Sequence, residues 1–122
     1  MQAFKWYKLS AEQNNSGGQF FLGQMFATGE GVAQNYKEAV KWFRLAAEQG
    51  RLAGQLALGK SYINGQGVTQ DYIEGLKWYF IGGGEKFDLW QEHISNVKSQ
   101  MTPDEIAEAQ KLANEWVREH GN

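Results

Sequence analysis

The sequence repeats itself at a fixed interval of 36 residues. Residues 22–32 read LGQMFATGEGV, and residues 58–68 read LGKSYINGQGV. A second segment recurs at the same interval, as KWY at residues 5–7, KWF at 41–43 and KWY at 77–79. A fixed period of this length is typical of solenoid proteins, in which each unit buries its apolar side against its neighbours. The sequence therefore predicts an array of similar units.

Each unit has the pattern of two helices joined by a glycine-rich loop. In residues 18–50, the apolar and small residues of the first half fall on one helix face, and that helix is expected to end at Gly29. A second helix is predicted from Tyr36 to Gly50. The next unit predicts helices over about residues 52–64 and 72–82. The fold class is therefore all-α.

Two glycines interrupt predicted helices at equivalent positions. Gly23 and Gly59 lie in the middle of the first helix of their units. Glycine in a helix interior costs about 1 kcal/mol relative to alanine. Because this cost recurs in register, we expect a helix crossing at which no side chain fits.

The C-terminal part departs from the repeat. The pattern stops at residues 82–84, which are all glycine, and two further helices are expected after it. One contains Phe87, Trp90 and Ile94. The other begins at Thr102, with Pro103 in its first turn and Glu105 completing a capping box. We interpret the chain as one domain, with a partial repeat at 2–17, repeats at 18–50 and 51–84, and capping helices at 85–122.

The N-terminal part begins inside a unit. Residues 3–7 align with residues 39–43, so the first helix of that unit is missing. Trp6, Trp42 and Trp78 occupy one repeated position and are expected to be packing residues. At this end the apolar side of Phe4, Trp6 and Tyr7 would lack its cover. The hypothesis is that the open N-terminal helix supports a weak homodimer.

The repeated positions resemble those of the Sel-one-like repeats (SLR), relatives of the tetratricopeptide repeats. The resemblance covers about residues 2–82. In the second unit the matching residues are Gln55, Leu58, Gly59, Tyr62, Gly65, Gly67, Val68, Gln70, Asp71, Tyr72, Trp78 and Tyr79. In the first they are Gln19, Leu22, Gly23, Gly29, Gly31, Val32, Gln34, Tyr36, Ala39, Trp42, Phe43, Ala46, Ala47 and Gly50. Glycine replaces the usual alanine at positions 18, 54 and 75.

The resemblance implies a right-handed α/α superhelix that scaffolds protein complexes. It implies no catalytic activity and no cofactor. Bacterial members are often periplasmic or secreted. The sequence does not distinguish these locations from the cytoplasm.

Composition and motifs argue against several other functions. A net charge of −2 provides no basic field for nucleic acid, and the absence of cysteine excludes thiolate metal sites. No apolar stretch approaches the roughly 18 residues of a membrane helix. His93 and His120 lack metal-ligand spacing. Residues 54–61, GQLALGKS, match the phosphate-loop pattern, but no strand precedes them and they fall within a predicted helix.

Surface recognition remains, and the resemblance indicates where it would occur. In related arrays the first helices line the concave face. The positions beside the packing stripe are Phe20, Gln24 and Thr28 in one unit, and Leu56, Lys60 and Asn64 in the next. These positions carry different residues in the two units, whereas packing positions carry similar residues. Phe20 and Leu56 are expected to be exposed apolar side chains that suit a docked peptide or helix; the alternative is that they cover each other or the flank of the array.

The main hypothesis is a non-enzymatic module that binds a protein or peptide in its concave groove. One alternative is a binder of small ligands or cell-wall fragments, or a hydrolase acting on them, which would need convergent polar groups and a titratable pair. Another is an immunity protein for a bacterial toxin, which the residues do not distinguish from the main hypothesis.

Overall fold

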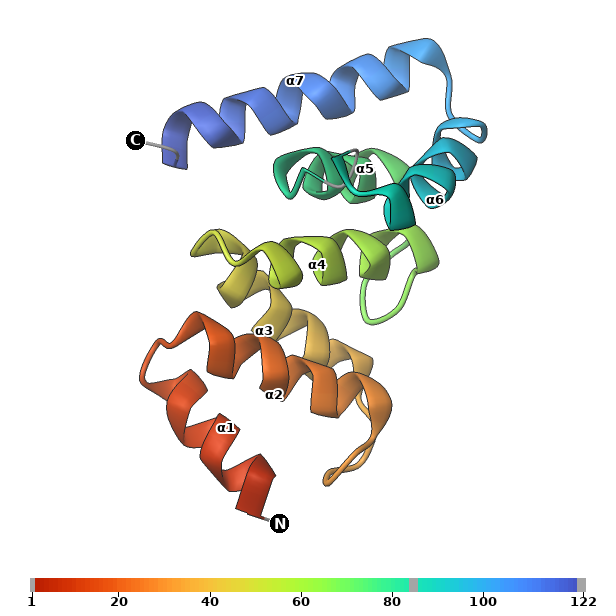
Figure 1. The fold of residues 1–122 in the computed structure, drawn as a ribbon. Helices are drawn as coiled ribbons and strands as arrows, with labels where there is room; N and C mark the ends of the chain where they lie inside the picture. Colours follow the sequence, from red (N-terminus) through yellow and green to blue (C-terminus); the bar gives the residue numbers. More distant parts are fainter. Residues whose placement is uncertain (1, 84–85, 121–122) are drawn as a thin grey trace.

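The computed structural model describes residues 2–83 and 86–120, and it places them in seven α-helices without a strand. Gly84 therefore lies outside the described residues. The helices are α1 (Gln2–Glu12), α2 (Ser16–Thr28), α3 (Tyr36–Glu48), α4 (Leu52–Asn64), α5 (Tyr72–Ile81), α6 (Asp88–Lys98) and α7 (Pro103–His120). α1 to α5 stack in succession, α7 lies over α5, and α6 lies to one side of α5 (Figure 1). The chain is an all-α helical-repeat solenoid, which confirms the predicted fold class.

The two full units have the same internal packing. α2 packs on α3 and α4 packs on α5, and the units are joined where α1 packs on α2 and α3 packs on α4. At each crossing within a unit, glycine allows the close approach. A Cβ on Gly23 would lie 2.8 Å from the Phe43 ring, and one on Gly59 would lie 2.7 Å from the Tyr79 ring. Real Cβ atoms do not approach so closely, so the predicted steric reason for both glycines is confirmed.

Several helices begin or end at residues with cap chemistry. α2 and α4 end at Gly29 and Gly65, whose φ angles of 78° and 67° are left-handed. α3 and α5 begin after Asn35 and Asp71, whose side chains accept hydrogen bonds from the backbone N–H groups of Glu38 and Glu74, three residues later, each at 3.1 Å. α2 begins at Ser16 because Asn15 caps it, accepting a hydrogen bond from the Gly18 N–H at 2.8 Å.

The last helix closes the array over α5. Its predicted capping box is present: the Glu105 backbone N–H donates to the Thr102 hydroxyl at 3.1 Å, and the Thr102 N–H donates to the Glu105 carboxylate at 2.8 Å. Trp116 of α7 packs edge-on against Trp78 of α5, with 5.5 Å between ring centroids. α7, rather than α6, is the later helix packed most extensively on α5 (Figure 1).

α6 keeps the register of the first helices but packs differently. Trp90 stands 36 residues after Gly54, in the same position of the repeat. A Cβ on Gly54 would lie 2.8 Å from the Cβ of Ala46, so the glycine lets α4 sit tightly on α3. An indole does not fit in such a space. Trp90 instead packs on Tyr79, with 5.2 Å between ring centroids.

The three tryptophans of the repeated position have different surroundings. Trp42 and Trp78 are 8% and 3% exposed, because the preceding unit covers them. Trp6 occupies the same position in α1 and is 68% exposed. Phe4 and Tyr7 are half-buried against α2. The expectation that all three N-terminal residues lack cover is therefore correct for Trp6 only.

Candidate functional site

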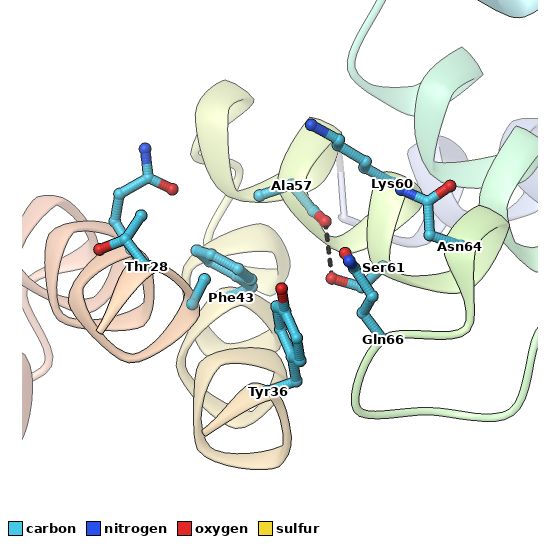
Figure 2. Close-up of a pocket in the computed structure, with 10 residues that line it drawn as sticks. Thr28, Tyr36, Phe43, Ala57, Lys60, Ser61, Asn64 and Gln66 are labelled. Carbon is cyan, nitrogen blue, oxygen red and sulfur yellow. Dashed lines mark hydrogen bonds between the residues drawn. The ribbon is translucent and has the colours of Figure 1, made fainter. Parts of the chain in front are cut away.

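A hollow of about 530 Å³ lies between α2, α3 and α4, and we call it the main hollow. Figure 2 shows Tyr36 and Phe43 of α3 standing between Thr28 on one side and Lys60 and Asn64 on the other. Phe43 is buried and forms part of the floor. The full lining is Gln24, Ala27, Thr28, Tyr36, Phe43, Ala57, Lys60, Ser61, Asn64 and Gln66.

Four of the six residues predicted for partner binding meet at this hollow. Gln24 and Thr28 come from α2, and Lys60 and Asn64 come from α4. All four side chains are exposed. They lie two turns or less from the ends of their helices, where the glycine-rich loops begin. The structure therefore brings the polar members of the predicted set together.

Phe20 and Leu56 do not line the main hollow, and the expectation that they are exposed is wrong. Both are half-buried. The ring of Phe20 packs against Phe43, with 5.9 Å between centroids. Leu56 lies beside the C-terminal end of α5, close to Gly82. The reason is that both positions fall on the seam between helices, where neighbouring apolar groups cover them.

Several lining residues were not among the predicted site residues. The second helix α3 contributes Tyr36 and Phe43, and the loop after α4 contributes Gln66. The prediction considered only the first helix of each unit. The repeat contains a signal for one of them, because Gln66 aligns with Glu30 and so differs between units. Tyr36 and Phe43 agree closely with their equivalents and carry no such signal.

The polar groups of the main hollow are largely available to a ligand. Within residues 2–83 and 86–120, the side chains of Gln24, Lys60, Asn64 and Gln66 have no hydrogen-bond or ion-pair partner. By contrast, the Ser61 hydroxyl donates to the Ala57 carbonyl at 3.0 Å (Figure 2). Carboxamides both donate and accept hydrogen bonds, and the ammonium group donates. The hollow therefore combines free polar groups with an apolar floor.

A second hollow of about 340 Å³ adjoins the first along α2, and we call it the side hollow. Gln24 and Thr28 line both hollows, so the two lie side by side, and we call the pair of hollows the groove. The rings of Tyr7 and Phe21 stack at the side hollow, with 5.2 Å between centroids. Its full lining is Ala3, Tyr7, Phe21, Gln24, Met25, Thr28 and Glu30.

The charges near the groove are few. Lys60 is the one charged residue among the described residues that line the main hollow, and Glu30 is the one in the side hollow. His93 of α6 lies close enough to Lys60 to be affected by its charge. Burial, and then the positive charge of Lys60, lower the pKa of His93 below its ordinary value. His93 is therefore neutral at pH 7.

The described residues contain no metal-binding cluster and no phosphate-binding loop. Across residues 2–83 and 86–120 there is no group of three or more histidine, cysteine, aspartate or glutamate side chains that could hold a metal ion. Residues 54–61 lie within α4, so the backbone N–H groups of the phosphate-loop pattern are committed to a helix. None of the described helices has the length and apolarity required to span a bilayer.

The chain matches the sequence model of a known protein family. The family model described as Sel1 repeat matches residues 1–15, 16–50 and 52–81, and thus most of the chain. The chain belongs to the Sel1 repeat family. This is the Sel-one-like repeat that the sequence pattern resembles. The Sel1 repeat is a non-catalytic scaffold type, and Sel1 repeat proteins generally mediate protein–protein interactions.

Two solved structures share the Sel1 repeat architecture. One is c5321, a protective antigen present in uropathogenic Escherichia coli strains that displays an SLR fold. It is 28% identical, with a TM-score of 0.88 over 96% of this chain. The other is a Sel1 repeat protein from Oxalobacter formigenes, 38% identical, with a TM-score of 0.64 over 70% of this chain. This chain spans 25% of the first and 35% of the second. No curated protein matches it.

Proposed function

We propose that this Sel1 repeat chain is a non-enzymatic interaction module that binds an extended segment of a partner protein in the groove. The observation that supports the proposal is the set of unpartnered side chains, Gln24, Lys60, Asn64 and Gln66, around the buried ring of Phe43. An extended peptide exposes main-chain N–H and C=O groups along its length. Carboxamides on both walls suit these groups, and the apolar floor suits a side chain between them.

The alternative of a hydrolase acting on cell-wall fragments has less support. General acid–base catalysis needs a titratable side chain within hydrogen-bond reach of the substrate, and glycoside hydrolysis usually needs two carboxylates. The titratable side chains in the described lining of the main hollow are Lys60 and Tyr36, and this lining contains neither a carboxylate nor an imidazole. An immunity protein that binds a toxin would use the same kind of surface, so it is a special case of the proposal.

A displayed library of random peptides tests the proposal. Peptides enriched on the wild-type chain would be measured against Gln24→Trp, which fills the point shared by both hollows. The matched control is Gln110→Trp, at an exposed position on α7. We expect the first substitution to abolish binding and the second to leave it unchanged. Circular dichroism would show that both variants remain folded.

Two results would contradict the proposal. Either no peptide is enriched, or the enriched peptides bind Gln24→Trp as well as they bind the wild type. Chemical-shift changes in the side-chain amides of Gln24 and Asn64 on binding provide an independent measurement of the site.

We propose further that α1 supports weak self-association. The support is the exposure of Trp6 and Leu9, which are 68% and 52% exposed on the same helix. The equivalent tryptophans Trp42 and Trp78 are covered by the preceding unit, so the position is built for contact with another helix.

A further inference from the structure

The two hollows of the groove carry opposite charges. Lys60 lies on the α4 wall of the main hollow, and Glu30 lies in the loop after α2 at the side hollow. Both side chains are exposed, and within the part of the chain that the structure describes neither has an ion-pair partner. Each charge lines one hollow only, whereas Gln24 and Thr28 line both. A segment that fills both hollows therefore passes from one charge to the other.

We propose that the groove selects a partner segment by the order of its charges, with an acidic side chain at Lys60 and a basic side chain at Glu30. This inference rests on the proposed function, because it presumes that a peptide occupies the groove. A segment in the opposite orientation would place like charges together in both hollows. Charge complementarity of this kind acts mainly on specificity, through the cost of the wrong arrangement.

The aromatic residues of the side hollow support a basic side chain there. Tyr7 and Phe21 stack beside Glu30, and Phe21 is 46% exposed. A guanidinium or ammonium group binds favourably over an aromatic face as well as to a carboxylate. The main hollow provides the opposite environment, because its free polar groups are amides and one ammonium group. These donors suit a carboxylate.

Charge reversal provides the test. The double variant Lys60→Glu/Glu30→Lys exchanges the two charges and leaves the net charge unchanged. The matched control is Glu108→Lys/Lys111→Glu, which makes the same exchange at exposed positions on α7. Each protein would be checked for folding by circular dichroism and then used to select from one displayed random-peptide library.

The wild type and the control should enrich peptides with an acidic and a basic residue in one order, and the double variant should enrich the reverse order. For a peptide selected on the wild type, Lys60→Ala should weaken binding about two- to fivefold at low salt, and less at high salt. Enrichment of the same charge order on all three proteins would overturn the inference and leave peptide binding intact. No enrichment on the wild type would overturn the proposed function and this inference with it.

Discussion

At the scale of single residues, the glycine at the centre of each unit determines how closely two helices approach. Gly59 is opposite both the Tyr79 ring and the carbonyl oxygen of Gly75, at 2.7 and 2.9 Å from a Cβ built on it. The second distance involves backbone, which cannot rotate away. Alanine would improve the helix propensity of α4 but would force α4 and α5 apart.

We therefore expect Gly59→Ala to lower the free energy of unfolding by about 2 kcal/mol, because an overpacking cost of about 3 kcal/mol against backbone exceeds the propensity gain of about 1 kcal/mol. The matched control is Gly17→Ala in the first turn of α2, where the nearest group is the flexible end of the Arg51 side chain at 3.1 Å. Urea denaturation measures both. Equal stability of Gly59→Ala and the wild type would contradict the tight crossing.

Residue-level prediction of exposure was correct for the polar side chains that point away from packing. Lys60 and Asn64 were identified because they differ from Gln24 and Thr28 in the other unit, and all four are exposed in the groove. Their contribution to partner binding stays a prediction. The same reasoning failed for Phe20. A residue that differs between the units can still be covered, and here the Phe43 ring covers Phe20.

At the scale of elements, α6 is held to α5 by a small aromatic cluster. The hydroxyl of Tyr79 and Nε2 of His93 are 2.8 Å apart, and Trp90 packs edge-on against both rings. Burial raises the pKa of Tyr79, so its hydroxyl stays protonated, and it donates to Nε2 when a neutral His93 carries its proton on Nδ1. Protonation of His93 would remove this acceptor and place a positive charge near Lys60.

This arrangement predicts acid sensitivity. The pKa of His93 is lower in the folded chain than in the unfolded chain, so the unfolded chain binds the proton more readily. Stability should therefore fall as the pH drops below about 6.5, the ordinary histidine value. His93→Gln should reduce this dependence, whereas His120→Gln, at the exposed end of α7, should retain it. Urea denaturation at a series of pH values measures the effect, and an unchanged profile in His93→Gln would refute the assignment.

α6 continues the register of the repeat beyond the predicted end of the array. Trp90 and Ile94 continue the 36-residue step, although the array was expected to stop at the glycines after α5. The helix itself was predicted. Its altered packing was not, because the consequence of tryptophan at the glycine position depends on the backbone it would meet.

At the scale of the whole molecule, the two ends of the solenoid differ. The C-terminal end is covered by α7, whose Trp116 packs on Trp78. The N-terminal end presents Trp6 and Leu9 on α1. A face of this kind has nothing apolar to pack against within the described chain, and apolar contact with a second copy would remove it from water.

We expect the wild-type chain to show an average mass that rises with concentration in sedimentation equilibrium, and Trp6→Glu to remain monomeric. Val117→Glu is the matched control, because Val117 is an exposed apolar residue (48%) on α7 at the other end. A wild-type chain that is monomeric at every concentration would contradict self-association through α1.

The sequence by itself determined the helices, their caps and the family, because these depend on local chemistry and on a period that is visible along the chain. Asn35, Asp71 and the glycines after α2 and α4 act on residues a few positions away. The composition of the groove was decided only by the tertiary structure. The α3 residues Phe43 and Tyr36 line it, whereas Phe20 does not and packs against Phe43. Whether an apolar side chain such as Phe20 or Phe43 lines the groove or is covered depends on how helices from different parts of the chain pack together.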